Sequence, residues 1–313
     1  EVDFYYTVSE PLTAQVWDHD EALGKVVRVL RQTRPEVVVT MNPAPSPGNH
    51  GNHQQAAMFA VEAYLLAGRE DVFPEHFEEG LTPFSPKRLL RSGSDGTSGT
   101  GPDAVAEGFE PVVASDVVYG TWNGTPSEHH GKRWSAVRDD SVHAYRTQGW
   151  HTRPPSSDDP AQIEVAWFTL IDSRAPLAEP TSGDTAALRG ATLPIEGGLP
   201  LGTTVEMSSE SFTALPGAPF EVEVAVGSPG SALPRAEVEL ELPEGWSAGR
   251  SRQVLGTIPA KQSRTATFTV TAPEGTAPDE HVLLRARVSS KKGEGFNVLP
   301  LRTAGPVEAG IAD

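Results

Sequence analysis

The sequence predicts a two-domain protein: an α/β domain of layered helix-sheet-helix (Rossmann-like) type, followed by an all-β immunoglobulin-like sandwich. Two observations carry this prediction. Helical apolar spacing alternates with a valine-rich strand near the start, and apolar residues recur at every second position beyond residue 204. The 313 residues suffice for two domains of ordinary size. We place the α/β domain at 1–179, a linker at 180–204, the sandwich at 205–303 and a tail at 304–313.

The first domain opens with a helix and then a strand between residues 17 and 40. Leu23, Val27 and Leu30 fall at helical spacing, and three valines at 37–39 indicate a short buried strand. Asp18 is the expected helix N-cap because Glu21 follows it at the capping-box spacing. This explains the acidic cluster around Asp18 as a helix start and not as a metal site.

A loop with three prolines follows the strand at 41–48, at the strand end where ligands bind in open α/β sheets. A helix is expected at 53–67, and its apolar face consists of Ala56, Ala57, Ala60, Val61 and Tyr64. A flexible loop at 91–104 and strands near 112–119 follow it. The domain then has a helix at 135–148, with Val137, Val142 and Tyr145 toward the core, and a strand at 162–170.

Beyond the linker, strict alternation predicts four strands, at 220–226, 238–242, 265–270 and 282–288. Proline- and glycine-rich turns separate them, which is typical of an antiparallel sandwich. The turn Pro-Glu-Gly-Trp at 243–246 is expected to place the indole of Trp246 against the end of the sandwich.

Composition limits the class of function. Charged residues make up 21% of the chain and the net charge is -17, which argues against nucleic acid and favours neutral or cationic ligands. Cysteine is absent, so any metal must be held by histidine and carboxylate. No apolar run is long enough to span a membrane. The start at Glu1 lacks a signal peptide and resembles the inside of a domain, which suggests a chain that begins in mid-protein.

The sharpest local feature is the sequence Gly-Asn-His-Gly-Asn-His at 48–53, where the proline loop meets a helix. His50 and His53 are three residues apart, so both imidazoles can face one cleft, one as a metal ligand and one in proton transfer. The alternative is ordinary turn and cap chemistry. Trp122, Trp134 and Trp150 either line a sugar-binding rim or pack in the core.

The run at 34–40, the proline loop, His50 to His53 and the Thr-Gln pair at 147–148 resemble the second half of PIG-L/LmbE-type zinc-dependent N-deacetylases. That family deacetylates N-acetylglucosaminyl lipids and the mycothiol precursor. The resemblance, which covers about residues 17–176, implies that His53 is a zinc ligand and that His50 assists the tetrahedral intermediate. The metal is Zn²⁺ or another divalent ion.

The chain departs from that family in two ways. The family's H-P-D-D-E motif, which carries the other ligands and the general base, is absent, so that half of the site is expected on a separate polypeptide. Asn52 stands where the family has an acid, and a neutral amide does not favour protonated His50 as an Asp would. Asn52 is equally well explained as a capping residue.

The C-terminal part, with its Leu-Pro-Gly at 215–217 and the turn ending at Trp246, resembles NEW3-type β-sandwiches found beside bacterial carbohydrate-active enzymes. The resemblances imply a secreted or cell-surface bacterial hydrolase that removes acetyl groups from N-acetylated sugars or glycoconjugates. The alternatives are a catalytically inactive carbohydrate-binding or cell-surface protein on a deacetylase fold, and an inert fragment.

Overall fold

The computed structural model describes residues 7–46 and 48–305, and it divides into two compact units. The first comprises Glu1–Ser92, Leu170–Leu177 and Leu188–Asp313 within the described residues, and the second comprises Gly93–Thr169 and Ala178–Ala187. Each is described by itself. The domain boundaries predicted at 179 and 204 stay predictions, because the units are defined by their contacts and not by position in the sequence.

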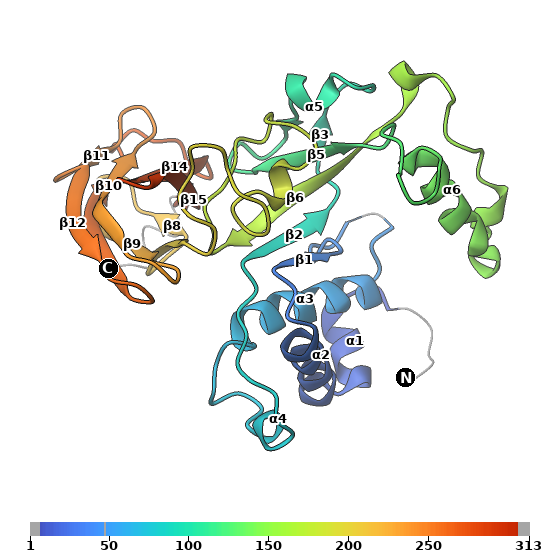
Figure 1. Cartoon of the computed structure of the whole chain (residues 1–313), viewed down its shortest axis with the longest axis horizontal. Coiled ribbons are helices and arrows are strands. Elements are labelled where there is room, and N and C mark those ends of the chain that lie inside the picture. Colours follow the sequence, from blue (N-terminus) through green and yellow to red (C-terminus); the bar gives the residue numbers. More distant parts are fainter. Residues whose placement is uncertain (1–6, 47, 306–313) are drawn as a thin grey trace. The chain divides into compact units, whose positions relative to one another are not determined.

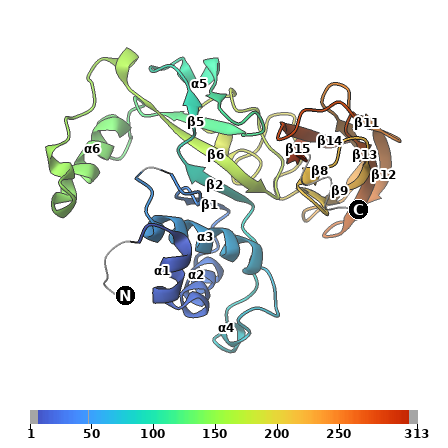
Figure 2. The ribbon, with the colours of Figure 1, turned by 180° about the vertical axis from the view of Figure 1, so that it is seen from behind.

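The first unit begins with helices and a pair of parallel strands (Figure 1). Its elements here are α1 (Glu10–Trp17), α2 (His19–Thr33), β1 (Val37–Thr40), α3 (Gly51–Leu66), the short α4 (Glu75–Glu78) and β2 (Arg88–Ser92). Figures 1 and 2 show α1, α2 and α3 side by side from opposite directions. In the sheet, β2 has β1 on one side and β6 (Val165–Ser173) on the other, and the last residues of β6 belong to this unit.

Helix α2 forms for the reasons that the sequence predicts. Asp18 is its N-cap, and the Oδ1 atom accepts a hydrogen bond from the Glu21 backbone N–H at 3.3 Å. Leu23, Val27 and Leu30 are buried and pack against the buried face of α3. The helix-start interpretation of this acidic cluster is therefore confirmed.

Strand β1 is present where predicted, but it is less buried than its three valines suggest. It pairs with β2 from Val37↔Arg88 to Thr40↔Arg91 and stands at the end of the strand order. Val39 is 52% exposed, and Met41 just beyond the strand is 41% exposed. An apolar strand at a sheet edge keeps one row of backbone N–H and C=O groups without a strand partner.

The C-terminal part of the first unit is a large β-sandwich, which confirms the all-β prediction. Its strands are β7 (Thr204–Ser209), β8 (Thr213–Ala214), β9 (Pro219–Gly227), β10 (Leu233–Glu241), β11 (Ser247–Ala248), β12 (Arg252–Ile258), β13 (Ser263–Thr271), β14 (His281–Ser290) and β15 (Gly293–Thr303). They form two sheets, ordered β12-β10-β14-β15-β8 and β11-β13-β9-β7. The inward residues of both sheets share one core.

Trp246 occupies the position that the turn at 243–246 predicts. It is 9% exposed and belongs to the sandwich core. Its indole meets the Phe220 ring edge-on, with 6.2 Å between ring centroids. The backbone N–H of Trp246 donates to the Pro243 carbonyl at 3.1 Å, which closes the turn. The sequence therefore indicated both the turn and the burial of its indole.

The second unit has little regular structure around two antiparallel strand pairs. Its elements are β3 (Gly96–Thr97), α5 (Ala104–Glu107), β4 (Glu110–Pro111), β5 (Val118–Trp122), α6 (Trp134–Ala144), the first residues of β6 and short 3-10 turns at Arg146–Gln148, Trp150–Thr152, Pro160–Gln162 and Ala186–Leu188, the last of which ends one residue beyond the unit. Strand β5 pairs with β6 from Val118↔Thr169 to Trp122↔Val165, and the short β3 pairs with β4. The loop predicted at 91–104 contains the short strand β3, so that prediction was too simple.

Two burial predictions for helices were wrong. Tyr145 lies just beyond α6 and is 53% exposed, because the helix ends at Ala144 before its spacing can carry Tyr145 to the core. On α3, Ala56 is exposed while Gln54 and Gln55 are buried. The finer prediction, of a Rossmann-like layered fold, stays a prediction: the structure is mostly β, and in the sheet ordered β1-β2-β6-β5 strand β1 pairs with β2 in parallel and β5 pairs with β6 in antiparallel fashion.

A buried histidine should make stability depend on pH. His76 is 2% exposed, and its Nδ1 lies 3.0 Å from Nη1 of Arg31. Because guanidinium can only donate, Nδ1 must accept, which requires a neutral ring. Burial first, and then the charges of Arg28 and Arg31, lower the pKa of His76 below its usual 6.5.

A histidine pKa that is lowered by folding contributes stability above the unfolded pKa, and that stability is lost as the pH falls below about 6.5. We expect the free energy of unfolding to drop between about pH 7 and pH 5.5, and to drop less in His76→Gln, whose amide oxygen can still accept from Arg31. Urea titrations at several pH values measure this. The same slope in both proteins would rule out His76 as the cause.

Candidate functional site

His50 and His53 lie together at the beginning of helix α3. His50 is the N-cap residue, and its carbonyl accepts hydrogen bonds from the backbone N–H groups of His53 at 3.0 Å and Gln54 at 3.2 Å. The two imidazole centroids are 4.0 Å apart, with an interplanar angle of 31°. Both side chains are half-buried. The spacing of three residues at the first helical turn therefore does bring the two rings side by side.

The electrostatics of this pair favour one neutral ring. Burial is the first cause that lowers the pKa of His53, and the neighbouring His50 is the second, because two positive imidazoles at this distance repel each other. A neutral imidazole has a lone pair available for a metal ion or a proton. The arrangement can therefore provide one metal ligand and one group for proton transfer.

Amide side chains hold the loop that carries the pair. Asn49 Nδ2 donates to the carbonyls of Asn42 and Ala44 at 2.8 and 2.7 Å, and Gln54 Nε2 donates to the Asn49 carbonyl at 2.6 Å. These bonds tie the proline loop to the start of α3. The histidine pair is thus built on a fixed turn at the carboxyl end of β1.

Asn52 has structural partners. Its Oδ1 accepts from the Thr7 backbone N–H at 3.2 Å and from the Thr13 hydroxyl at 3.4 Å. The Thr7 carbonyl accepts in turn from the Gly51 backbone N–H at 2.7 Å. Asn52 therefore joins the start of α3 to Thr7 and to α1. The capping role that the sequence left open for it was wrong, because His50 is the N-cap residue and no side chain caps the first turn of α3.

The residues present do not form a complete metal site. Over 7–46 and 48–305, no three His, Asp or Glu side chains come together as a metal ion requires. A catalytic zinc takes about three protein ligands and a water. Two imidazoles alone do not fit that requirement. Within the same ranges, no helix is long and apolar enough to cross a membrane.

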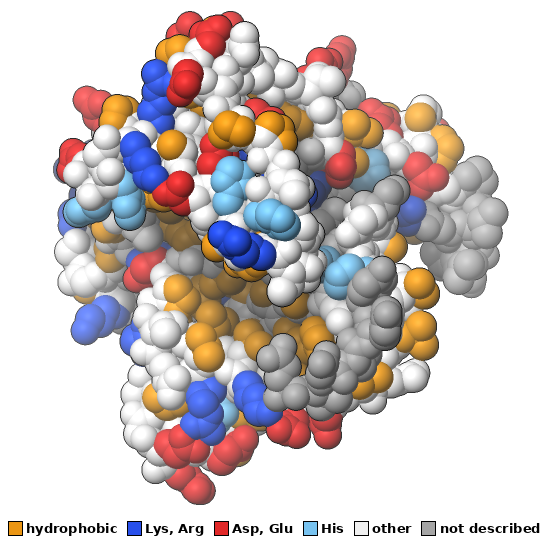
Figure 3. Space-filling model, turned by 90° about the vertical axis from the view of Figure 1, so that its right-hand side faces the viewer, with side chains coloured by type: hydrophobic (Ala, Val, Ile, Leu, Met, Phe, Trp, Pro, Cys, Tyr) orange, Lys and Arg blue, Asp and Glu red, His pale blue; other side chains and the backbone are white. Residues whose placement is uncertain are grey.

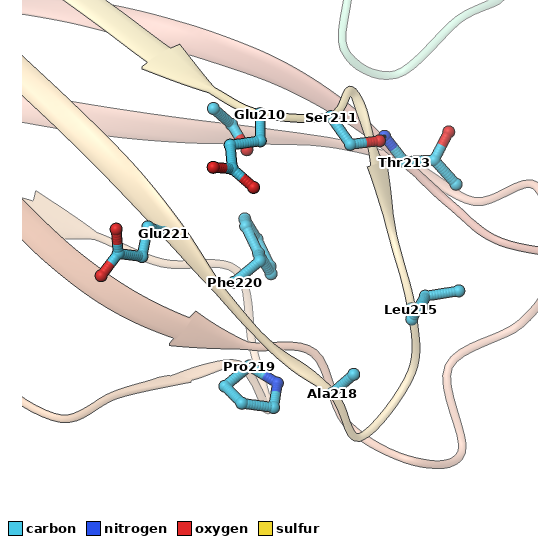
Figure 4. Close-up of a pocket in the computed structure, with 9 residues that line it drawn as sticks. Glu210, Ser211, Thr213, Leu215, Ala218, Pro219, Phe220 and Glu221 are labelled. Atoms are coloured by element: carbon cyan, nitrogen blue, oxygen red, sulfur yellow. The ribbon is translucent and has the colours of Figure 1, made fainter. Parts of the chain in front are cut away.

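A hollow lies on the sandwich, between the end of β7 and the start of β9 (Figure 4). Its volume is about 700 Å³, and it is lined by Ser209, Glu210, Ser211, Thr213, Leu215, Ala218, Pro219, Phe220 and Glu221. In Figure 4 the Phe220 ring points toward Glu210, while Glu221 extends from the other side of the strand. No sequence motif signalled this hollow, because residues of three strands, β7, β8 and β9, and of the loops between them meet to form it.

The second unit contains two adjoining cavities that share Asn123 and Arg138. One, of about 410 Å³, has Trp122, Trp134 and Phe168 in its walls, and the other, of about 250 Å³, has mainly polar walls. Trp150, the third tryptophan of the predicted rim, lines neither cavity and packs at a tilt of 52° against the Tyr145 ring, with ring centroids 5.3 Å apart.

The surface charge is dispersed. On the face drawn in Figure 3, acidic side chains are spread over the surface, in keeping with the net charge of -17. Hydrophobic side chains are also exposed on that face. A spread of negative charge disfavours anionic ligands in general but does not mark one site.

One family model matches this chain: the NPCBM-associated, NEW3 domain of alpha-galactosidase, over residues 214–289. The match lies within the sandwich and agrees with the predicted NEW3-like part. It covers less than half of the chain. A search among curated proteins gave no match.

Three of the solved structures that match this chain each cover a third of it, at low identity. Spo0M, a sporulation control protein from Bacillus subtilis, is 15% identical, with 33% of this chain and 49% of that protein covered and a TM-score of 0.24. The CARDB domain of a Pyrococcus furiosus protein in complex with di-metal ions is 14% identical. The match covers 33% of this chain and 87% of that domain, with a TM-score of 0.25. AvmM, which catalyzes macrocyclization in alchivemycin A biosynthesis, is 15% identical. The match covers 33% of this chain and 90% of AvmM, with a TM-score of 0.27. Scores this low carry no functional argument, and the match spans about half of Spo0M.

Proposed function

We propose that residues 1–179 are the C-terminal part of a PIG-L/LmbE-like, zinc-dependent N-deacetylase, which removes acetyl groups from N-acetylated amino sugars or glycoconjugates. The observation that carries the proposal is the imidazole pair of His50 and His53, 4.0 Å apart at the start of α3 and directly beyond β1. The carboxyl ends of strands are where open α/β sheets bind ligands.

The zinc site requires residues that this sequence does not contain. Because His50 and His53 cannot hold a catalytic zinc by themselves, the remaining ligands and the general base must come from an H-P-D-D-E segment on a separate or missing polypeptide. When bound, the metal would polarise the acetamide carbonyl and activate a water.

The roles of this chain's own two imidazoles follow from their surroundings. The lowered pKa of His53 keeps that ring neutral near pH 7, as a metal ligand must be. His50 lies beside it, where it can hold a proton and give it to the leaving amine. Neutral Asn52 does not supply the negative charge that would help His50 retain that proton.

The edge strand β1 is the natural place for the additional segment. Its three valines are only partly covered, and β2 is its one strand partner within the described residues. A strand added parallel to β1 would bury this apolar surface and would end near the histidine pair. The layered Rossmann-like arrangement would then include that added strand.

The sandwich has a supporting role in this proposal. NEW3 domains accompany alpha-galactosidase, a carbohydrate-active enzyme, as the name of the matching family model states. We assign the sandwich as a spacer or weak carbohydrate binder and give it no catalytic residue. Such an enzyme would act outside the cell, secreted or at the surface of a bacterium.

One observation favours a second candidate, a catalytically inactive carbohydrate-binding or cell-surface protein. Asn52 occupies the position of the family's acid and is engaged by Thr7 and Thr13. An amide with a structural role at this position is consistent with a domain that keeps the deacetylase fold but has lost deacetylase activity. The two candidates differ in whether acetate is released.

The test is an acetate-release assay on N,N′-diacetylchitobiose, using this chain co-purified with a polypeptide that carries the H-P-D-D-E half of a related deacetylase. We expect activity in the complex, and a fall of about 10²-fold or more in kcat for His50→Gln with the bound metal retained. His129→Gln, at an exposed histidine in the second unit, is the matched control and should keep full activity. A stable complex that binds zinc but releases no acetate would favour the inactive candidate.

A further inference from the structure

Helix α6 and the β5–β6 pair enclose a cleft in the second unit. The helix contributes Trp134, Val137, Arg138 and Ser141, whose spacing of three, four and seven residues places them on one face. The strands contribute Thr121, Ala166 and Phe168. Thr121 pairs with Ala166, and Phe168 lies two residues along, so these three share one face of the sheet. The cleft therefore lies between a helix face and a sheet face.

The helix is fixed by its first turn, and this keeps the cleft open. The backbone N–H of Ser135 donates to the Asn123 carbonyl at 2.7 Å, and that of Trp134 donates to the Thr125 carbonyl at 3.1 Å. The ring of Trp134 stays 45% exposed instead of filling the space. The cavity of about 410 Å³ falls in the usual range for small-molecule sites.

A second tryptophan forms the wall at the end of β5. Gly124 lies against the ring of Trp122, so that a Cβ built there would be only 2.1 Å from the ring carbon Cζ2. Glycine at this position therefore fixes how the indole is placed. The cleft thus has two tryptophans and Phe168 in its walls, and planar aromatic faces suit a flat, partly apolar ring.

A polar cavity adjoins the aromatic one and shares Asn123 and Arg138 with it. Most of its polar groups already have partners. Asp139 accepts from the Ser156 backbone N–H at 2.7 Å and from its hydroxyl at 2.9 Å, and Arg138 lies 3.3 Å from a Glu164 oxygen. Nδ2 of Asn123 and Nε1 of Trp122 are different: both are buried and have no hydrogen-bond partner among the described residues.

Unpaired buried donors favour a ligand rich in acceptor oxygens. Both donors are shielded from solvent, so the Asn123 amide must turn toward the cavity to meet such a ligand. A pyranose combines the required features, since it has an apolar C–H face for the indoles and hydroxyl oxygens at its rim. A lipid tail would leave the polar cavity unused, and an anion is disfavoured by the net charge of -17.

We propose that the cleft between α6 and the β5–β6 pair is a carbohydrate-binding site that takes a neutral pyranose stacked on Trp134. The site stands on residues of the second unit alone and does not rest on the deacetylase proposal. It would retain a glycan whether or not His50 and His53 take part in chemistry.

The experiment is calorimetric titration of the whole chain with chitotriose and with cellotriose. We expect binding of at least one of them with a Kd on the order of 0.1–1 mM. Trp134→Ala should weaken binding at least about tenfold, as loss of a central aromatic contact does. Trp150→Ala is the matched control, because Trp150 is also exposed, at 37%, and lies in the same unit outside the cleft. Its affinity should be unchanged.

A second variant, which fills the cleft, distinguishes loss of the binding site from loss of the fold. Ser141→Arg keeps every aromatic residue and places a long side chain in the cleft from an exposed helical position, so it should also abolish binding while the circular dichroism spectrum stays that of the wild type. Lack of binding to both sugars up to about 10 mM by the wild type would overturn the proposal, and so would equal affinities of the Trp134→Ala and wild-type proteins. Loss of sugar binding with acetate release retained in the complex would separate this site from the deacetylase site.

Discussion

Arg31→Met should destabilise the first unit by about 3 kcal/mol or more. Arg31 is 2% exposed, and its guanidinium donates to the backbone carbonyls of Ala67, Arg69, Val72 and Phe73, at 2.8 to 3.1 Å. Methionine fills a similar space but has no donor. Several buried carbonyl oxygens would lose their partner at once, and each such loss costs on the order of 1–3 kcal/mol.

The control for this prediction is Arg28→Met, one helical turn earlier on α2. Arg28 pairs with Glu79 at the surface, where screening makes an ion pair weak, so we expect a much smaller loss. Urea unfolding followed by circular dichroism compares the two variants with the wild type. Equal, small losses for both would show that Arg31 does not organise the segment from Ala67 to Phe73.

The proposed function predicts that His53→Ala releases zinc from a complex of this chain with an H-P-D-D-E polypeptide. Loss of an outer-shell partner alone weakens metal binding about 10–100-fold, and we expect the loss of a direct ligand to exceed that range. His50→Ala should leave the affinity for zinc within about tenfold of the wild type while the activity falls. Competition with a zinc chelator measures both affinities. Unchanged zinc affinity in His53→Ala would remove this residue from the ligand set.

Local patterns predicted the elements whose cause is local. The N-cap at Asp18, the buried face from Leu23 to Leu30 and the turn before Trp246 each depend on a few neighbouring residues, and the structure contains them. The four strongly alternating strands of the sandwich were likewise found. Strands β7, β8, β11, β12 and β15 were missed. Gly256 and Pro300 interrupt the patterns of β12 and β15, and β8 and β11 have only two residues each.

Features that depend on distant contacts could not be predicted. Helix α3 carries small apolar residues all round, so its sequence has no clear face, and the buried Gln54 and Gln55 took the place expected of Ala56. For the histidine pair, spacing alone predicted that the two rings lie together, and this is what the structure has. The cleft required Trp122 and Trp134 to meet across β5 and α6, which no local pattern reveals.

The most direct measurement is zinc analysis, together with intact mass spectrometry, of the undenatured protein purified with any polypeptide that accompanies it. The account predicts a second polypeptide that contains H-P-D-D-E and about one zinc ion per complex, with the metal lost in His53→Ala. A complex that contains both halves but no zinc after dialysis against micromolar metal would contradict the deacetylase proposal, and the glycan cleft between α6 and the β5–β6 pair would remain as a separate function.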